Sequence, residues 1–430
     1  MNIKNMGKLK CLVTNVISRM KINKLILLVF FILVSNFIQT KAQVVSIDTV
    51  LSTVEINYPM LLMYDAKIKA LNAYAEGAKS WMAPQFGAGL FMYPYNGEKD
   101  MGAFMISGEQ MIPNPLKLSA NKKYMQSMSA VEQENKSFSQ NQMFSMAKMF
   151  YYDWVIMKKK RKVLNLSEEI LEYIIASSEN KYPYGDQKLN SIYKAKSELY
   201  DLKSMQVMLE QEISQMRIAL NTLMNRDKNI LFDVDSSFVI QNYEIQLVDT
   251  SAIKSYRSDF KSVEKQISMI QFKQQLEINQ RLPDFGIRYD HMNAFGMPPN
   301  QFTVMGMITI PIAPWSSKMY KANVKGLNFE IASMQKQKEN IANEVAGKLE
   351  DLRTQLKFKK QQLILYSDNI IPSLKKNYET TLLAYNQNTE MLFMVLDAWE
   401  MFNMKQLEYL DKVNELLQIQ ISYEKEIEKR

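Results

Sequence analysis

The sequence has very few of the residues that carry covalent, metal and nucleophilic chemistry. Its 430 residues include one cysteine and one histidine. A single cysteine excludes a disulfide-stabilised scaffold and a cysteine-rich metal cluster. A single histidine leaves little room for a histidine zinc site or a Ser-His-Asp triad. Helix-breaking residues are also scarce, with 13 glycines and 12 prolines, which favours long helices over many short elements.

Long hydrophobic runs are almost absent. The one strongly apolar run is LILLVFFILVSNFI at residues 25–38, with Lys21 and Lys24 before it and the small residue Ala42 after it. This order predicts a secretory signal peptide over residues 1–42, with Met20 as an alternative start. A retained membrane anchor is the other interpretation, but a spanning helix needs about 20 apolar residues.

The excess of positive charge lies almost entirely in this predicted signal peptide. Residues 1–42 contain seven lysines and arginines, no acidic residue and the only cysteine. The remaining 46 cations and 45 anions give a net charge of +1, against +8 for the whole chain. The basic balance therefore indicates export, and we expect no nucleic-acid partner.

An internal repeat runs through the rest of the chain. Pro84-Gln85-Phe86-Gly87 recurs as Pro283-Asp284-Phe285-Gly286, and Tyr182 recurs as Tyr385, at offsets of 199 and 203 residues. Matches in the same order at nearly the same offset predict two copies of one unit. The predicted parts are a first repeat at 43–226, a connector at 227–248 and a second repeat at 249–430.

Each repeat is predicted to contain a helix, a β-hairpin and a long helical hairpin. Residues 187–225 lack proline and glycine, and their apolar residues recur at helical spacings. The strand candidates are about ten residues long, and apolar and polar residues alternate weakly along them. Strands that cross a membrane have this length and alternate between lipid-facing and lumen-facing residues. The expected bounds are about 84–112 and 284–310 for the β-hairpins and about 116–225 and 316–428 for the helical hairpins.

Two motifs resemble those of the TolC-type outer-membrane efflux family. The segment Gln110-Met111-Ile112-Pro113-Asn114-Pro115-Leu116-Lys117-Leu118 is similar to the Q-x-I-P-x-x-x-K-L exit from the first hairpin in heavy-metal efflux channels. Tyr182-Pro183-Tyr184-Gly185 and Tyr385-Asn386-Gln387-Asn388 resemble the periplasmic tips of the helical hairpins. The resemblance covers essentially the whole chain beyond residue 42.

The resemblance implies a mostly α fold with a small transmembrane β part. Four strands cannot close a barrel, and open sheet edges do not occur in lipid. The family's solution is a homotrimer with a twelve-stranded β-barrel in the outer membrane of a Gram-negative bacterium and a twelve-helix barrel in the periplasm. Its partners would be a periplasmic adaptor protein, an inner-membrane pump and outer-membrane lipid.

The resemblance also implies functional positions at the hairpin tips. Tyr182, Gly185, Tyr385 and Asn388 are expected to dock the adaptor. The family often places two aspartates three residues apart at the pore constriction, and Met394 and Asp397 stand at those positions. Together with Met391, they are the predicted constriction residues.

Methionine is unusually abundant, with 31 residues in the chain. Thioethers are soft ligands that suit Cu(I) and, by extension, Ag(I). Methionine also packs as a flexible hydrophobe in helix interfaces, and that interpretation suits most of the pairs at i, i+3 spacing. Met394 is the exception, because its implied pore position makes it a candidate metal ligand.

The predicted function is that of a passive exit duct, with no enzymatic activity and no cofactor. Metal cations of the copper/silver or cobalt-zinc-cadmium class are the preferred substrates. General drug efflux and type I secretion are alternatives for such a channel. A periplasmic coiled-coil adaptor or structural protein is the alternative from another class, although a pure coiled coil has no reason to carry four alternating ten-residue segments.

Overall fold

The computed structural model describes residues 43–98, 100–184, 188–242 and 257–428. The predicted signal peptide and Gly185 lie outside the described residues. The chain divides into a small and a large unit. The small unit holds strand β1 (Gln43–Val45) and most of β4 (Phe232–Val234), which pair in a two-stranded sheet. The large unit holds the helices and a four-stranded sheet.

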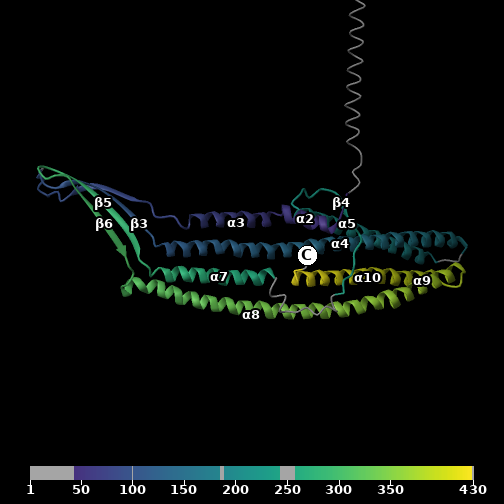
Figure 1. Cartoon of the computed structure of the whole chain (residues 1–430). Coiled ribbons are helices and arrows are strands. Elements are labelled where there is room, and N and C mark those ends of the chain that lie inside the picture. Colours follow the sequence, from purple (N-terminus) through teal and green to yellow (C-terminus); the bar gives the residue numbers. More distant parts are fainter. Residues whose placement is uncertain (1–42, 99, 185–187, 243–256, 429–430) are drawn as a thin grey trace, which may run out of the picture. The chain divides into compact units, whose positions relative to one another are not determined.

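The large unit repeats one order of elements (Figure 1). In its first half this order is α2 (Ile47–Asn57), α3 (Pro59–Gly77), β2 (Gln85–Phe91), β3 (Ala103–Ile112), α4 (Pro115–Lys181) and α5 (Leu189–Leu223), with a 3-10 turn, η1 (Tyr182–Tyr184), between α4 and α5. The second half contains α7 (Ser258–Asn279), β5 (Asp284–Ala294), β6 (Gln301–Thr309), α8 (Pro314–Leu365), η3 (Tyr366–Ile370), α9 (Ile371–Asn386) and α10 (Leu392–Glu426). The predicted fold class, with two tandem copies of helix, β-hairpin and helical hairpin, is confirmed for the single chain.

Two helices are interrupted where proline removes a backbone donor. The helical segment before β2 divides into α2 and α3 at Tyr58, whose extended backbone precedes Pro59. The long helical segment after β6 contains a π-helical turn, η3, between α8 and α9, just before Pro372. Proline has no N–H to donate to the preceding turn, so the hydrogen-bond ladder must shift at both places.

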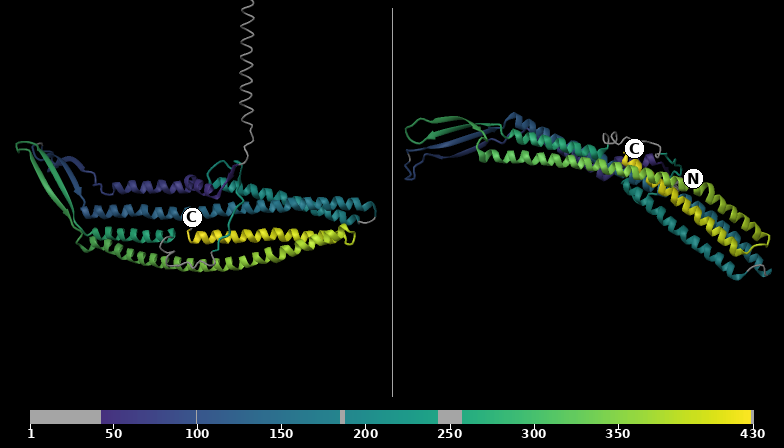
Figure 2. Two further views of the ribbon diagram at one scale, coloured as in Figure 1. Left: turned by 45° about the vertical axis from the view of Figure 1, so that its right-hand side comes forward. Right: turned by 90° about the horizontal axis from the view of Figure 1, so that it is seen from below.

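The helices pack side by side in a fixed order. Helix α4 packs against α3, α5, α7 and α10, and α8 packs against α7 and α10. Figures 1 and 2 show the sheet at one end of these helices and the helical-hairpin turns at the other. A cluster of buried leucines from α8 and α10, including Leu352, Leu356, Leu416 and Leu417, joins Ile156 of α4. Within the described chain, no helix has a stretch that is long and apolar enough to cross a membrane.

The sheet is antiparallel, in the order β2-β3-β5-β6. The pairing of β3 with β5 joins the two repeats, since Met105 lies opposite Met292 and Gln110 opposite Ile287. Strands β2 and β6 each have one neighbour in this sheet, so both present an open edge. Successive residues alternate between the two faces of the sheet.

Candidate functional site

The junction between sheet and helices contains the motif that follows the first hairpin. Asn114 caps α4 by accepting a hydrogen bond from Leu116 N at 3.0 Å, and Pro115 occupies the first helical position. Asp284 Oδ1 accepts a hydrogen bond from Asn114 N at 2.9 Å, and Asp284 Oδ2 lies 2.6 Å from Lys117 Nζ. The motif therefore ties the start of α4 to the start of β5 in the other repeat.

The tip of the second helical hairpin is closed by a left-handed residue. Asn388 has φ of 57°, and its N–H donates to Tyr385 O at 3.1 Å. Thr389 N donates to Ala384 O at 2.9 Å, which completes a Schellman motif. Asparagine is one of the few residues with a side chain that enters this backbone region readily.

Tyr385 is buried inside the tip. Its side chain is 1% exposed, and its hydroxyl lies 2.9 Å from Ser178 Oγ of α4. Ser178 Oγ donates to Ile174 O at 2.7 Å, so the Tyr385 hydroxyl donates to Ser178. The hydroxyl of Tyr385 thus links the second hairpin to α4, and the buried side chain offers little surface to a partner.

Lys181 connects the two tips. Its Nζ donates to Tyr385 O at 3.1 Å and to Asn388 Oδ1 at 2.8 Å, and it lies 4.2 Å from the centroid of the Tyr385 ring. Tyr182 follows in η1 and is exposed, as is Asn388. Of the predicted docking residues that the structure describes, Tyr182 and Asn388 lie on the surface and Tyr385 supports them.

The predicted constriction residues share one exposed stripe of α10. Met391 is the N-cap of α10, and Met394 and Asp397 follow on the exposed face. Met401 and Met404 continue this stripe at heptad spacing and are also exposed. The opposite face of the same turns is buried through Leu392, Val395, Leu396, Ala398 and Trp399. Their role as a constriction stays a prediction.

A pair of carboxylates, which sequence reasoning missed, lies near the tips. Burial raises the pKa of Glu198 on α5, and the negative charge of Glu400 on α10 raises it further. Lys194 lowers this pKa in part, and its Nζ lies 4.4 Å from the centroid of the Phe393 ring. The two carboxylates belong to different repeats, so their approach has no local signal in the sequence.

The two faces of the sheet differ in chemistry. One face, here the apolar face, carries large side chains that are all exposed: Phe86, Leu90, Phe104, Ile106, Phe285, Ile287, Tyr289, Phe302, Val304 and Ile308. Its polar members include Gln110, His291 and Asn293. The other face, here the polar face, carries Gln85, Ser107, Glu109, Asp284, Arg288, Asp290, Gln301, Thr303 and Thr309 beside methionines, small residues and Phe91. Arg288 Nε lies 3.0 Å from Asp290 Oδ1 on this face.

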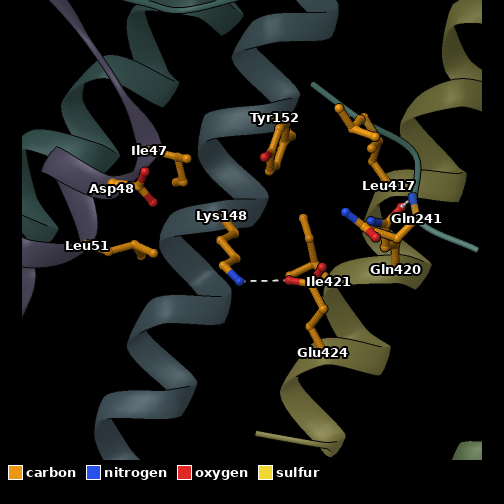
Figure 3. A pocket seen from close by; sticks show the side chains of 11 residues that line it. Ile47, Asp48, Leu51, Lys148, Tyr152, Gln241, Leu417, Gln420, Ile421 and Glu424 are labelled. Carbon is orange, nitrogen blue, oxygen red and sulfur yellow. Dashed lines mark hydrogen bonds and ion pairs between the residues drawn. The ribbon is translucent and has the colours of Figure 1, made fainter. Parts of the chain in front are cut away.

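A pocket of about 320 Å³ lies between α2, α4 and α10 (Figure 3). Lys148 Nζ lies 2.7 Å from Glu424 Oε2 within it, and both side chains are largely buried. Burial raises the pKa of Tyr152, and the charges of Glu424 and Asp48 raise it further. The ion pair neutralises the two charges that α4 and α10 bring together. Across the described residues, no three histidine, cysteine, aspartate or glutamate side chains are grouped to hold a metal ion.

Comparison with solved structures identifies the class of this fold. The outer-membrane channel OprN superposes with a TM-score of 0.74 at 10% identity, covering 89% of both chains. The outer-membrane protein VceC from Vibrio cholerae gives 0.72 at 11% identity, covering 89% of this chain and 95% of VceC. CusC, described for its transmembrane channel formation, gives 0.73 at 13% identity, covering 91% and 95%.

These likenesses define the fold of the chain as that of TolC-type outer-membrane channels. The resemblance stated from the sequence is thereby confirmed at the level of the fold. No protein-family model matches the chain, and a search of curated proteins found no match.

Proposed function

We propose that the chain is the outer-membrane component of a tripartite efflux system in a Gram-negative bacterium. It would act as a passive trimeric exit duct that extends into the periplasm. The observation that carries this proposal is the sheet, whose one face is apolar and exposed while the other is polar. Apolar-out and polar-in alternation is the pattern of strands in a water-filled membrane barrel.

The open edges of the sheet support association of identical chains. Strands β2 and β6 end the sheet on either side. Unpaired backbone groups cost several kcal/mol each in hydrocarbon, so an open edge is not stable there. Pairing β6 of one copy with β2 of the next removes both edges, and three copies would close a barrel of twelve strands.

The outer helices support the same association. Helices α3 and α5 lie beyond α4 on one side, whereas α8 and α9 lie beyond α7 and α10 on the other. Both sides expose several large apolar residues, and contiguous apolar surface of this kind marks sites of association. These residues are Met60, Leu62, Met63, Tyr74, Tyr193, Tyr200, Val207 and Met208 on α3 and α5, and Met319, Phe329, Phe358, Ile364, Leu365 and Leu383 on α8 and α9.

The tips are proposed to meet a periplasmic adaptor, with an inner-membrane pump supplying the energy. Tyr182 and Asn388 are the exposed members of the proposed docking surface. Met391, Met394 and Asp397 are proposed to form the constriction behind it. This arrangement needs no reaction chemistry in the chain, in keeping with a duct rather than an enzyme.

Metal cations are the proposed substrates. The support is the methionine content, the exposed Met394 and the resemblance of the Gln110–Leu118 segment to heavy-metal efflux channels. General drug efflux and type I secretion use the same architecture and remain alternatives. A coiled-coil adaptor is disfavoured, because such a protein has no use for a four-stranded sheet with one exposed apolar face.

Two experiments test the proposal, one for the channel and one for the metal substrate. The protein purified from outer membranes in detergent should be a heat-modifiable trimer that conducts ions in a planar bilayer. A monomer in the periplasmic fraction would overturn the channel. A deletion strain should lose tolerance to copper, silver, zinc, cobalt or cadmium, and unchanged tolerance to all five would overturn the metal substrate alone.

A further inference from the structure

The methionines of the sheet all lie on one face. Strands β3, β5 and β6 contain five of them, and the register places every one on the polar face: Met105, Met111, Met292, Met305 and Met307. The large apolar side chains on the other face of the four described strands are phenylalanine, isoleucine, leucine, valine and tyrosine. The methionines of these strands therefore share the face that carries Arg288 and Asp290.

Two of these methionines converge across a glycine. Met111 of β3 and Met307 of β6 lie opposite Gly286 of β5, one from either side. A Cβ atom built on Gly286 would lie 2.8 Å from Met111 Sδ and 3.0 Å from Met307 Cε. Glycine weakens a strand, so its presence often marks a close approach. Here the space above Gly286 is occupied by two thioether groups.

A second pair lies further along the same face. Met105 of β3 is the direct cross-strand partner of Met292 of β5. Directly paired residues have Cβ atoms about 5 Å apart, close enough for their side chains to touch. Between the two pairs, Met305 lies opposite Arg288. Thioethers thus recur along the face at three levels of the sheet.

The chemistry of the face selects one class of ion. Thioethers are neutral, soft donors that favour Cu(I), and by the same softness Ag(I), over hard or borderline cations. Cu(I) and Ag(I) carry a single charge, which neutral ligands stabilise without a carboxylate. The described part of the chain groups no set of histidine and acidic side chains that would suit a divalent metal.

We propose that the polar face of the sheet is a binding track for soft monovalent metal ions, with its principal site at Met111 and Met307 over Gly286. This proposal rests on the proposed function, because that function makes the polar face the lining of a pore. In a closed trimer each site would occur three times. Ions leaving the periplasmic tunnel would meet these thioethers on their way out.

The test is silver binding to the trimer purified from outer membranes in detergent. Titration calorimetry with silver nitrate in a chloride-free buffer should show binding by the unmodified protein. The Met111→Leu/Met307→Leu variant should lose its principal site, since leucine keeps the side-chain volume and removes the sulfur. Met101→Leu/Met297→Leu is the matched control, because it removes two exposed methionines that lie outside the strands and should leave that site intact.

The outcomes distinguish failure of the proposed binding track from failure of the proposed channel function. Equal loss in both variants, or no loss in the strand variant, would overturn the track, because silver would then bind thioethers regardless of place. Both variants should keep the trimer and its conductance in a planar bilayer. A conducting trimer with no silver site would overturn the track alone, whereas failure of the unmodified protein to form conducting trimers would overturn the channel.

A third variant tests the role of the glycine. Gly286→Ala keeps both thioethers but places a methyl group where Met111 Sδ and Met307 Cε converge. We expect weaker silver binding with an unchanged number of methionines. Unaltered binding in this variant would show that the convergence over Gly286 does not build the site.

Discussion

The ammonium group of Lys117 lies 2.6 Å from a carboxylate oxygen of Asp284, across the junction between the two repeats. Asp284 also accepts a hydrogen bond from the backbone N–H of Asn114. One side chain at the start of β5 therefore holds both the N-cap and the first turn of α4. The side chains of Lys117 and Asp284 are 12% and 28% exposed, so solvent screens this pair less than a surface pair.

Asp284→Ala should destabilise the chain by about 2 kcal/mol, because it leaves a partly buried ammonium and a backbone donor without their acceptor. Thermal unfolding of the detergent-solubilised protein, followed by circular dichroism, measures the effect. Glu339→Ala is the control, since both side chains of its pair with Lys336 on α8 are exposed and the pair should contribute little. Equal melting of the two variants would contradict a special role for the junction.

The left-handed backbone of Asn388 predicts opposite effects for two substitutions at this position. Asn388→Gly should be tolerated, because glycine adopts φ near +57° without strain. Asn388→Val should cost about 1–2 kcal/mol, because a β-branched side chain clashes in this region. Both variants lose the bond from Lys181, so their difference reports the backbone strain. Hydrogen exchange at the Thr389 amide, which closes the turn, should accelerate in the valine variant only.

The fold class could be predicted from patterns that repeat along the chain. Leu209, Ile213 and Leu220 recur at helical spacing and are buried on one side of α5. The shared Pro-x-Phe-Gly segments mark the start of both hairpins, and Phe86 and Phe285 lie on the same face of the sheet. Such signals are local, so one sequence is enough to find them.

The contacts between the repeats could not be predicted in the same way. The convergence of Met111 and Met307 depends on the register of β3 with β5, whose residues are far apart in the chain. Glu198 and Glu400 likewise meet only after two hairpins pack. Tyr385 is buried and bonded to Ser178 on α4, a contact that helical periodicity does not specify.

The two faces of β6 predict opposite effects for neighbouring substitutions. Val304 lies on the apolar face and Thr303 on the polar face. Val304→Lys should cost about 2–4 kcal/mol if that face meets lipid near the membrane centre, and should block assembly. Thr303→Lys adds the same charge to the polar face and should be tolerated. Outer-membrane fractionation and heat-modifiability of the trimer would distinguish them, and equal assembly would argue against a lipid-facing apolar surface.

The raised pKa of Glu198 predicts that the contact between α5 and α10 weakens as the pH rises. A carboxyl group whose folded pKa lies above its unfolded value binds protons more tightly in the folded state. Its contribution to stability is therefore complete below its ordinary pKa of 4.5 and is lost as the pH rises through the raised value. Above that pH, the charged Glu198 is repelled by Glu400, with Asp201 adding to the repulsion and Lys194 offsetting part of it.

Glu198→Gln should remove this component, because a neutral amide cannot ionise. Hydrogen exchange across the tips of α5 and α10, corrected for the intrinsic effect of pH, should increase from pH 4 to pH 7 in the unmodified protein and change less in the variant. Glu212→Gln, an exposed position on the same helix, is the matched control. An identical pH profile in all three proteins would exclude the carboxylate pair as the cause. A stronger dependence in Glu198→Gln would reverse the sign of the argument, because the ionised pair would then stabilise the tip.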